Sequence, residues 1–158
     1  TTMDIITDFN FGAATGTTTV DQIQFNANFL GNANGAETAG DFTAAAKANN
    51  STGSVDTISS GVTGIDAATD VAIFTGTTYN NAAELDTAIE GLTATAVTQD
   101  FFAFYQDGFG NTRMAIAESS GVEAGGAADF TVTDVYTFTG VTIGSIAGLI
   151  DTGDFIVV

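Results

Sequence analysis

The side chains in this sequence that could carry chemistry are almost all carboxylates. The chain has 158 residues, with 19 Asp and Glu against 2 Lys and Arg, and it contains no His and no Cys. Without His or Cys the chain lacks the usual general base, the thiolate nucleophile and the usual zinc ligands. Ser-His-Asp and Cys-His catalysis are therefore excluded, and paired carboxylates of the glycosidase kind are the remaining catalytic arrangement.

Two groups of carboxylates are close enough in the sequence to be considered as such a pair. Glu84, Asp86 and Glu90 fall in a predicted helix, and Glu118 and Glu123 fall near a loop. A carboxyl group becomes a general acid when an apolar pocket raises its pKa. Nothing in the sequence places two of these residues in such a pocket. We therefore expect that the protein is not an enzyme and has no catalytic residues.

A further polar group, Asp107-Gly108-Phe109-Gly110-Asn111, is either a metal loop or a hairpin turn. Strand-like runs at 101–106 and 112–117 flank it, and its Asp-Gly and Gly-Asn pairs are typical of hairpin turns. It lacks the D-x-D-x-D-G spacing and the final Glu of an EF-hand. The sequence favours the hairpin turn.

The strand before this turn carries four aromatic residues: Phe101, Phe102, Phe104 and Tyr105. Successive side chains of a strand point to opposite faces, so the row occupies both faces. We interpret these rings as core plus an interface, with a sugar-binding platform as the alternative.

The net charge of -17 limits which partners the chain can bind. Such a field repels nucleic acid and anionic membrane surfaces, and it attracts cations. The two basic residues, Lys47 and Arg113, cannot form a basic patch, so nucleic-acid binding is excluded. No apolar run approaches the roughly 18 residues that a membrane helix needs, so membrane insertion is not expected. High acidity also suits a protein from a salty environment, so charge alone identifies no ligand.

The elements that must position these residues are mostly short strands. Alternating, branched or aromatic residues predict strands at 4–9, 20–25, 70–75, 101–106, 112–117, 129–139 and 155–158. Apolar residues at helical spacing predict a helix over 82–92 after Asn80 or Asn81. A shorter helix is expected over 42–48 after Asp41. The expected fold is mainly β: an antiparallel β-sandwich or roll with one or two short helices, as a single domain over residues 1–158.

Three segments resemble the C-terminal region of repeats-in-toxin (RTX) bacterial exoproteins. Asp4-Ile5-Ile6-Thr7-Asp8-Phe9, followed by Asp21-Gln22-Ile23-Gln24-Phe25, is similar to the D-x-I-x-D-F … D-x-I-x-F segment that closes the calcium β-roll of that family. Residues 101–117 are similar to its aromatic hairpin. Asp154-Phe155-Ile156-Val157-Val158 is similar to the tails of type I secretion substrates, including serralysin-like proteases and secreted surface-layer proteins. The family's glycine-rich nonapeptide array is absent from these residues.

The resemblance implies a calcium site and a secretion signal. Ca²⁺ is the expected cofactor, with Asp4, Asp8 and Asp21 as ligands, since calcium prefers several hard oxygen ligands. The alternative is that these aspartates are ordinary solvated strand carboxylates. Asp154 to Val158 is the expected type I secretion signal. The alternative is a final core strand, and the two interpretations are compatible if the exporter recognises the tail before folding.

The resemblance also implies a function. We expect a non-catalytic secreted structural protein, such as a surface-layer, extracellular-fibre or adhesin subunit, located outside the bacterial cell or on its surface. Expected partners are further copies of the chain, the type I exporter and, as a further candidate, a cell-surface glycan. The alternatives are a secretion and folding module of a larger exoenzyme, or a carbohydrate-binding module. The start at Thr1 resembles the middle of a longer chain, so either a precursor was cut or a larger part precedes it.

Overall fold

The computed structural model describes residues 3–7, 9, 21–25, 55–60, 64–65, 69, 71–92, 100–122, 128–147, 149 and 155–157. This part of the chain contains eight strands and two short helices. The mainly β class expected from the sequence is therefore confirmed. The predicted helix at 42–48 lies outside the described residues.

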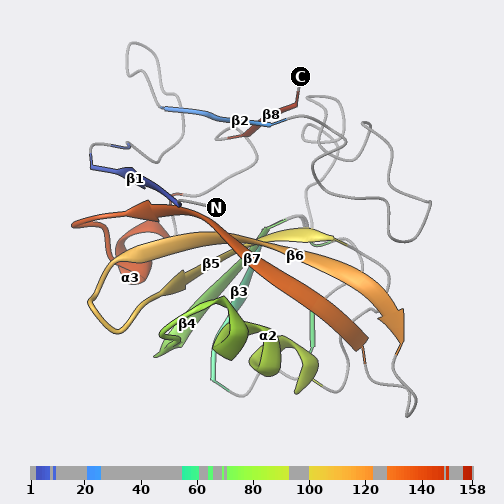
Figure 1. Ribbon diagram of the computed structural model, residues 1–158. Coiled ribbons are helices and arrows are strands. Elements are labelled where there is room, and N and C mark those ends of the chain that lie inside the picture. The colour runs from blue at the N-terminus through green and yellow to red at the C-terminus, as the bar shows by residue number, and fades with distance from the viewer. Residues whose placement is uncertain are drawn as a thin grey trace.

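Six strands form one mixed sheet in the order β1-β7-β6-β5-β4-β3 (Figure 1). They are β1 (Asp4–Ile6), β3 (Val55–Ile58), β4 (Val71–Thr78), β5 (Phe101–Gln106), β6 (Thr112–Val122) and β7 (Ala128–Phe138). The pairs β5–β6 and β6–β7 are antiparallel, and β5–β6 is the hairpin that the sequence predicted. The pairs β1–β7, β3–β4 and β4–β5 are parallel.

The expectation of an antiparallel sheet is thus wrong for these three pairs. Helix α2 (Ala82–Glu90) lies in the connection between β4 and β5. A connection that contains a helix can carry the chain back to the end of the sheet from which it started, so the next strand runs parallel. The short connections between β5 and β6 and between β6 and β7 require antiparallel pairing.

Helix α2 begins where the sequence predicted. The Asn81 side chain accepts a hydrogen bond from the Glu84 backbone N–H at 3.0 Å, and the Glu84 carboxylate accepts one from the Asn80 backbone N–H at 2.8 Å. These bonds satisfy backbone donors that a helix start leaves unpaired. Leu85 and Ile89 are fully buried one turn apart, so they define the face that packs on the sheet.

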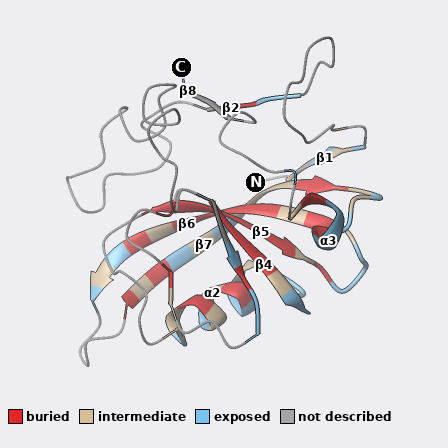
Figure 2. Ribbon diagram, turned by 180° about the vertical axis from the view of Figure 1, so that it is seen from behind, coloured by how far each residue is buried: buried red, intermediate tan, exposed pale blue. Residues whose placement is uncertain are grey.

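The sheet has a hydrophobic core on each face. On one face, Leu85 and Ile89 of α2 pack with a cluster that includes Phe101, Tyr105 and Phe130. Alternate residues of the same strands form the other core, which includes Val71, Ile73, Phe102, Phe104 and Phe138. Figure 2 shows the buried residues concentrated along the middle of β4 to β7.

A second layer covers the face opposite α2. It contains helix α3 (Ile143–Ile146) and a parallel two-stranded ribbon of β2 (Ile23–Phe25) and β8 (Phe155–Val157). Ile23, Ile143 and Ile146 belong to the core on that face. Figure 1 shows the ribbon and α2 on opposite sides of the sheet. No helix in the described part has the length and hydropathy needed to cross a membrane.

Candidate functional site

The turn between β5 and β6 is organised by one buried carboxylate. Asp107 is 2% exposed, and its Oδ1 accepts hydrogen bonds from the backbone N–H groups of Phe109 and Asn111, both at 2.9 Å. Gly110 has φ +85°, a left-handed conformation that glycine adopts without strain. At Gly108 an added Cβ would lie 2.6 Å from the Asn80 Oδ1 atom. The Asp107 carboxylate is therefore used to hold the turn, as the hairpin interpretation requires.

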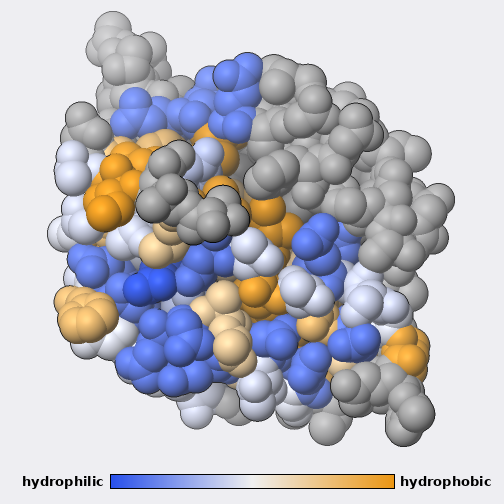
Figure 3. Space-filling view, viewed as in Figure 1, coloured by the Kyte–Doolittle hydropathy of each residue, from blue (hydrophilic) through white to orange (hydrophobic). Residues whose placement is uncertain are grey.

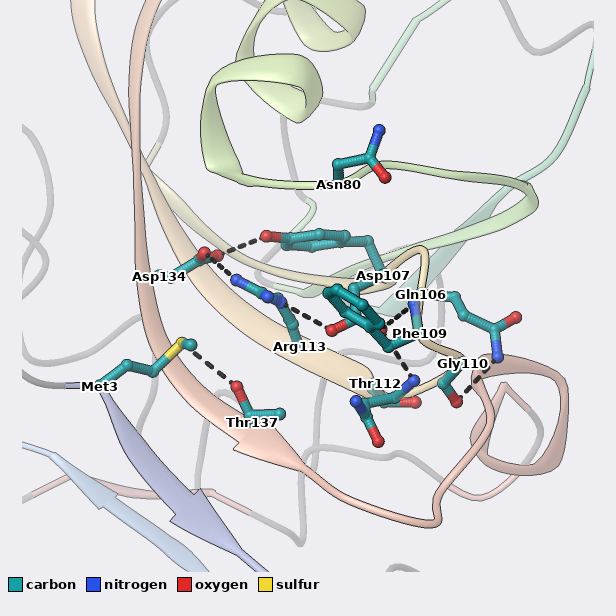
Figure 4. Close-up of polar contacts among 12 residues, drawn as sticks. Met3, Asn80, Gln106, Asp107, Phe109, Gly110, Thr112, Arg113, Asp134 and Thr137 are labelled. Atoms are coloured by element: carbon teal, nitrogen blue, oxygen red, sulfur yellow. Dashed lines mark hydrogen bonds and ion pairs between the residues drawn. The ribbon is translucent and has the colours of Figure 1, made fainter.

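The same carboxylate begins a network that joins three strands. Arg113 Nε donates to Asp107 Oδ2 at 3.1 Å, and Arg113 Nη1 donates to Asp134 Oδ2 at 2.9 Å (Figure 4). The Tyr105 hydroxyl donates to Asp134 Oδ1 at 2.6 Å. We call Tyr105, Asp107, Arg113 and Asp134 the Arg113 cluster. Every carboxylate oxygen of its two aspartates accepts a hydrogen bond.

Three groups of the Arg113 cluster have pKa values shifted from their ordinary values. Burial opposes ionisation of Asp107, but hydrogen bonds from Asn111, Arg113 and Phe109 outweigh it and lower the Asp107 pKa. Burial likewise disfavours the Arg113 cation, but the hydrogen bonds to Asp107 and Asp134 raise its pKa. Burial, followed by Asp134, raises the Tyr105 pKa far above its ordinary value. These three groups are poorly suited to proton transfer near neutral pH, which requires a group that titrates there. The cluster is a structural network.

The structure describes most of the carboxylates that the sequence suggested as catalytic pairs. The Glu84 carboxylate accepts hydrogen bonds from Asn80, which lower its pKa, and it belongs to the helix cap. Burial raises the Asp86 pKa, and the nearby Glu90 and Asp129 carboxylates raise it further. Glu123 lies outside the described residues.

The structure describes two of the three expected calcium ligands, Asp4 and Asp21. The backbone of Asp4 begins β1 opposite Tyr136, and Asp21 is exposed just before β2. Asp8 lies outside the described residues. Within the described ranges, no three Asp or Glu residues form a group that could hold a metal ion. Asp4 lies in the six-stranded sheet, whereas Asp21 precedes a strand of the two-stranded ribbon.

The expected secretion signal contains β8. Phe155, Ile156 and Val157 pair in register with Ile23, Gln24 and Phe25 of β2. Two segments that resemble the same protein family, from opposite ends of the chain, thus form one ribbon. Asp154 and Val158 lie outside the described residues.

The aromatic row of β5 faces the two cores. Phe101, Phe102, Phe104 and Tyr105 are all at most 1% exposed, so they do not form a platform on the surface. The exposed aromatic side chain of the hairpin is Phe109, at the turn, with 86% of its surface accessible.

Sequence reasoning did not find the Arg113 cluster. Arg113 is the only arginine in the chain, and that composition was the one available signal, because a lone arginine among many carboxylates will be paired. Its partners depend on strand register. Arg113 lies opposite Thr137, and the register shifts between Met114 and Ala115, so Asp134 could not be identified from spacing.

One buried carboxylate outside the cluster gives a pH prediction. Asp100 is 1% exposed; burial raises its pKa, although a hydrogen bond from the Ser119 backbone N–H at 2.7 Å opposes this. With a folded-state pKa above the ordinary 3.8, the folded protein takes up this proton before the unfolded chain does. The Asp100 contribution to the unfolding free energy therefore rises as the pH falls through the folded pKa, and Asp100→Asn is expected to remove that rise.

Urea unfolding at about pH 7 and about pH 5 measures this effect. In EGTA, lowering the pH should change the unfolding free energy of Asp100→Asn less favourably than that of the wild-type protein. Identical pH dependences for the two proteins would contradict the prediction.

Comparison with known proteins supplies no relative for this chain. No family model matches it, and no match is found among curated proteins or among solved structures.

Proposed function

We propose that this chain is a non-catalytic secreted structural protein, a subunit of a bacterial surface layer, extracellular fibre or adhesin. In this proposal residues 154–158 act as a type I secretion signal, and calcium promotes folding or assembly outside the cell. A secretion and folding module of a larger exoenzyme is the alternative. The composition supports a structural role, because a chain without His and Cys has few catalytic groups to offer.

The pairing of β2 with β8 is the observation that carries the proposal. The D-x-I-x-F segment that ends at Phe25 and the tail that contains Phe155 to Val157 are two of the three segments that resemble RTX exoproteins. An exporter would recognise the tail in an extended form. The pairing with β2 gives this tail a position in the folded protein. Folding would then remove the tail from the exporter once the chain is outside.

The proposed fold is a sandwich or roll with exposed outer strands. The β2–β8 ribbon lies over the sheet face opposite α2, with Ile23 in the shared core, which supports the sandwich or roll expected from the sequence. Strands β1 and β3 are the outermost strands of the described sheet. An outer strand presents backbone groups with which another chain can pair, which supports self-association into an oligomer or polymer.

Secretion is tested by separating the tail sequence from the folded ribbon. The deletion of residues 154–158 is expected to abolish export from a host with a type I exporter, measured as the fraction of protein in the medium. The matched control is Gln24→Pro, which disturbs ribbon pairing because proline lacks a backbone N–H, but leaves the tail intact. This control should still be exported. Wild-type export of the deletion variant would refute the signal.

Calcium dependence is tested by circular dichroism and light scattering in EGTA and then with added calcium. We expect folding or assembly with a midpoint of about 0.1–1 mM, the range of extracellular calcium modules. Sodium chloride at matched ionic strength is the control, since it screens the net charge of -17 without binding specifically. The triple variant Asp4→Asn, Asp8→Asn, Asp21→Asn should lose the response. A protein that is folded and monomeric in EGTA, and unchanged by calcium, would contradict this part of the proposal.

A further inference from the structure

A small pocket lies between the β3–β4 edge of the sheet and α2. Its volume is about 170 Å³, and it is partly open to solvent. Ile58 and Phe74 from the strands and Ala88 and Leu92 from the α2 side form its apolar wall. The pocket is separate from the Arg113 cluster and from the β2–β8 ribbon.

The rest of the lining consists of hydroxyl groups. They come from the serines and threonines that follow β3 or belong to β4, and from one tyrosine: Ser59, Ser60, Thr75, Thr77 and Tyr79. A hydroxyl group both donates and accepts hydrogen bonds. None of the described residues that line the pocket is Asp, Glu, Lys or Arg, although the chain carries a net charge of -17. This described lining therefore offers no charged partner to a cation or an anion.

The size of the pocket restricts its ligand to one ring. A cavity of about 150 Å³ holds a benzene molecule, whereas pockets for drug-sized ligands begin at about 300 Å³. The 170 Å³ pocket therefore accommodates a single six-membered ring. A neutral ring that has both an apolar C–H face and several hydroxyl groups matches the two halves of the lining.

The aromatic wall of the pocket is held in place. The Tyr79 ring makes T-shaped contacts with Phe74 and Tyr105, both with ring centroids 6.1 Å apart, and its backbone N–H donates to the Gln106 carbonyl at 3.0 Å. Thr75 Oγ1 donates to the Ile58 carbonyl at 3.4 Å. When a ligand enters a pocket whose side chains are already ordered, the entropic cost of ordering them is smaller, so binding is tighter.

We propose that this pocket binds a single neutral pyranose sugar unit. The hydroxyl-bearing side chains bond the sugar hydroxyls, and the apolar wall contacts the C–H face of the ring. This site goes beyond the proposed structural function and depends on neither secretion nor calcium. It also places sugar binding on α2 and β4 rather than on the buried aromatic row of β5.

Nuclear magnetic resonance titration of the full chain tests the site. The probes are D-glucose, D-galactose, D-mannose and N-acetyl-D-glucosamine, at up to about 50 mM, because one small polar ligand binds in the millimolar range. At least one sugar should shift the backbone amide signals of Ser60, Thr77 and Tyr79. Cyclohexanol, which has the ring but only one hydroxyl, should bind at least tenfold more weakly.

A pair of matched helix variants localises the binding. Ala88→Leu fills the pocket, and it should weaken the sugar at least tenfold. Ala83→Leu makes the same change on an exposed residue of α2 that does not line the pocket, so it should bind as the wild type does. Both alanines are replaced by another good helix former, and circular dichroism should show that both variants keep the fold.

A second variant tests one hydroxyl of the lining. Thr77→Val removes an exposed hydroxyl, which is also hydrogen-bonded to Tyr79, with little change of shape. It should weaken binding about three- to tenfold, the value of one hydrogen bond. The proposal is overturned if none of the four sugars shifts these signals, if Ala88→Leu binds as well as Ala83→Leu, or if cyclohexanol binds as tightly as the best sugar.

Discussion

Arg113→Met is expected to lower the free energy of unfolding by about 2–4 kcal/mol. The substitution keeps most of the apolar stem but removes the cation between Asp107 and Asp134, whose carboxylates lie 3.1 and 2.9 Å from the guanidinium. The Asp107 side chain is 1% exposed, so water cannot replace the lost partner. Removal of one partner from a buried ion pair leaves an uncompensated charge, which costs more than the pair contributes. Urea unfolding followed by circular dichroism measures the loss.

The matched variant Arg113→Lys keeps the charge but not the planar group that reaches both aspartates. We expect the unfolding free energy of Arg113→Lys to lie between those of the wild type and Arg113→Met. The pKa of Asp107 is lowered, so its stabilising contribution is present above its ordinary value of 3.8 and is lost as the pH falls toward the folded pKa. The difference in unfolding free energy between the wild type and Arg113→Met should therefore become smaller below about pH 5. A gap that stays constant down to acid pH, or disappears in high salt at neutral pH, would argue against a buried ion pair.

Among the substitutions that we propose, Phe138→Ala should destabilise the core most. We expect it to lower the free energy of unfolding by about 3–5 kcal/mol. Phe138 is fully buried at the end of β7, and its ring contacts Phe9, Phe104 and Tyr136 with centroid separations of 5.2, 6.2 and 6.4 Å. The substitution leaves a cavity, because Phe104 and Tyr136 sit on strands of the sheet and cannot collapse into the space. It also removes the ring that joins Phe9, beyond β1, to the centre of the sheet.

The chain supplies a control for this prediction. Phe109→Ala is the same substitution on a side chain that is 86% exposed, and it should change the unfolding free energy by no more than about 0.5 kcal/mol. The chain has no tryptophan, so circular dichroism is the suitable probe for both variants. Equal losses for Phe138→Ala and Phe109→Ala would contradict the two-core arrangement of the sheet.

The hydropathy of the described surface gives no single docking face. The exposed large apolar residues are dispersed over β1, the hairpin turn, the end of β6 and the segment after α3: Ile5, Phe109, Val122 and Leu149. On the face shown in Figure 3, apolar and hydrophilic side chains are interspersed. Isolated exposed apolar residues are normal for a folded protein. The self-association that we propose is therefore better attributed to strand edges than to an apolar patch.

Local patterns in the sequence determined much of the secondary structure. The 101–117 hairpin followed from its turn residues, and the helix at Ala82–Glu90 followed from its capping asparagine and its apolar spacing. Strands at 4–6, 71–78 and 128–138 lie within or close to the predicted ranges. These elements were predictable because turn chemistry, capping and periodicity act between residues that are near one another in the chain.

Only the tertiary structure decided which strands are neighbours and which polar groups meet. Alternation along a strand identifies its buried face, but it carries no information about the partner strand, so the parallel pairs β1–β7, β4–β5 and β2–β8 were not predicted. The Arg113 cluster depends on those pairings, because Asp134 reaches Arg113 only across the β6–β7 ladder. The pocket likewise exists only where α2 packs beside β3 and β4. Local spacing determined most of the strands and helix α2, but not β3. Long-range packing, which buries both faces of the sheet at once, determined the sites.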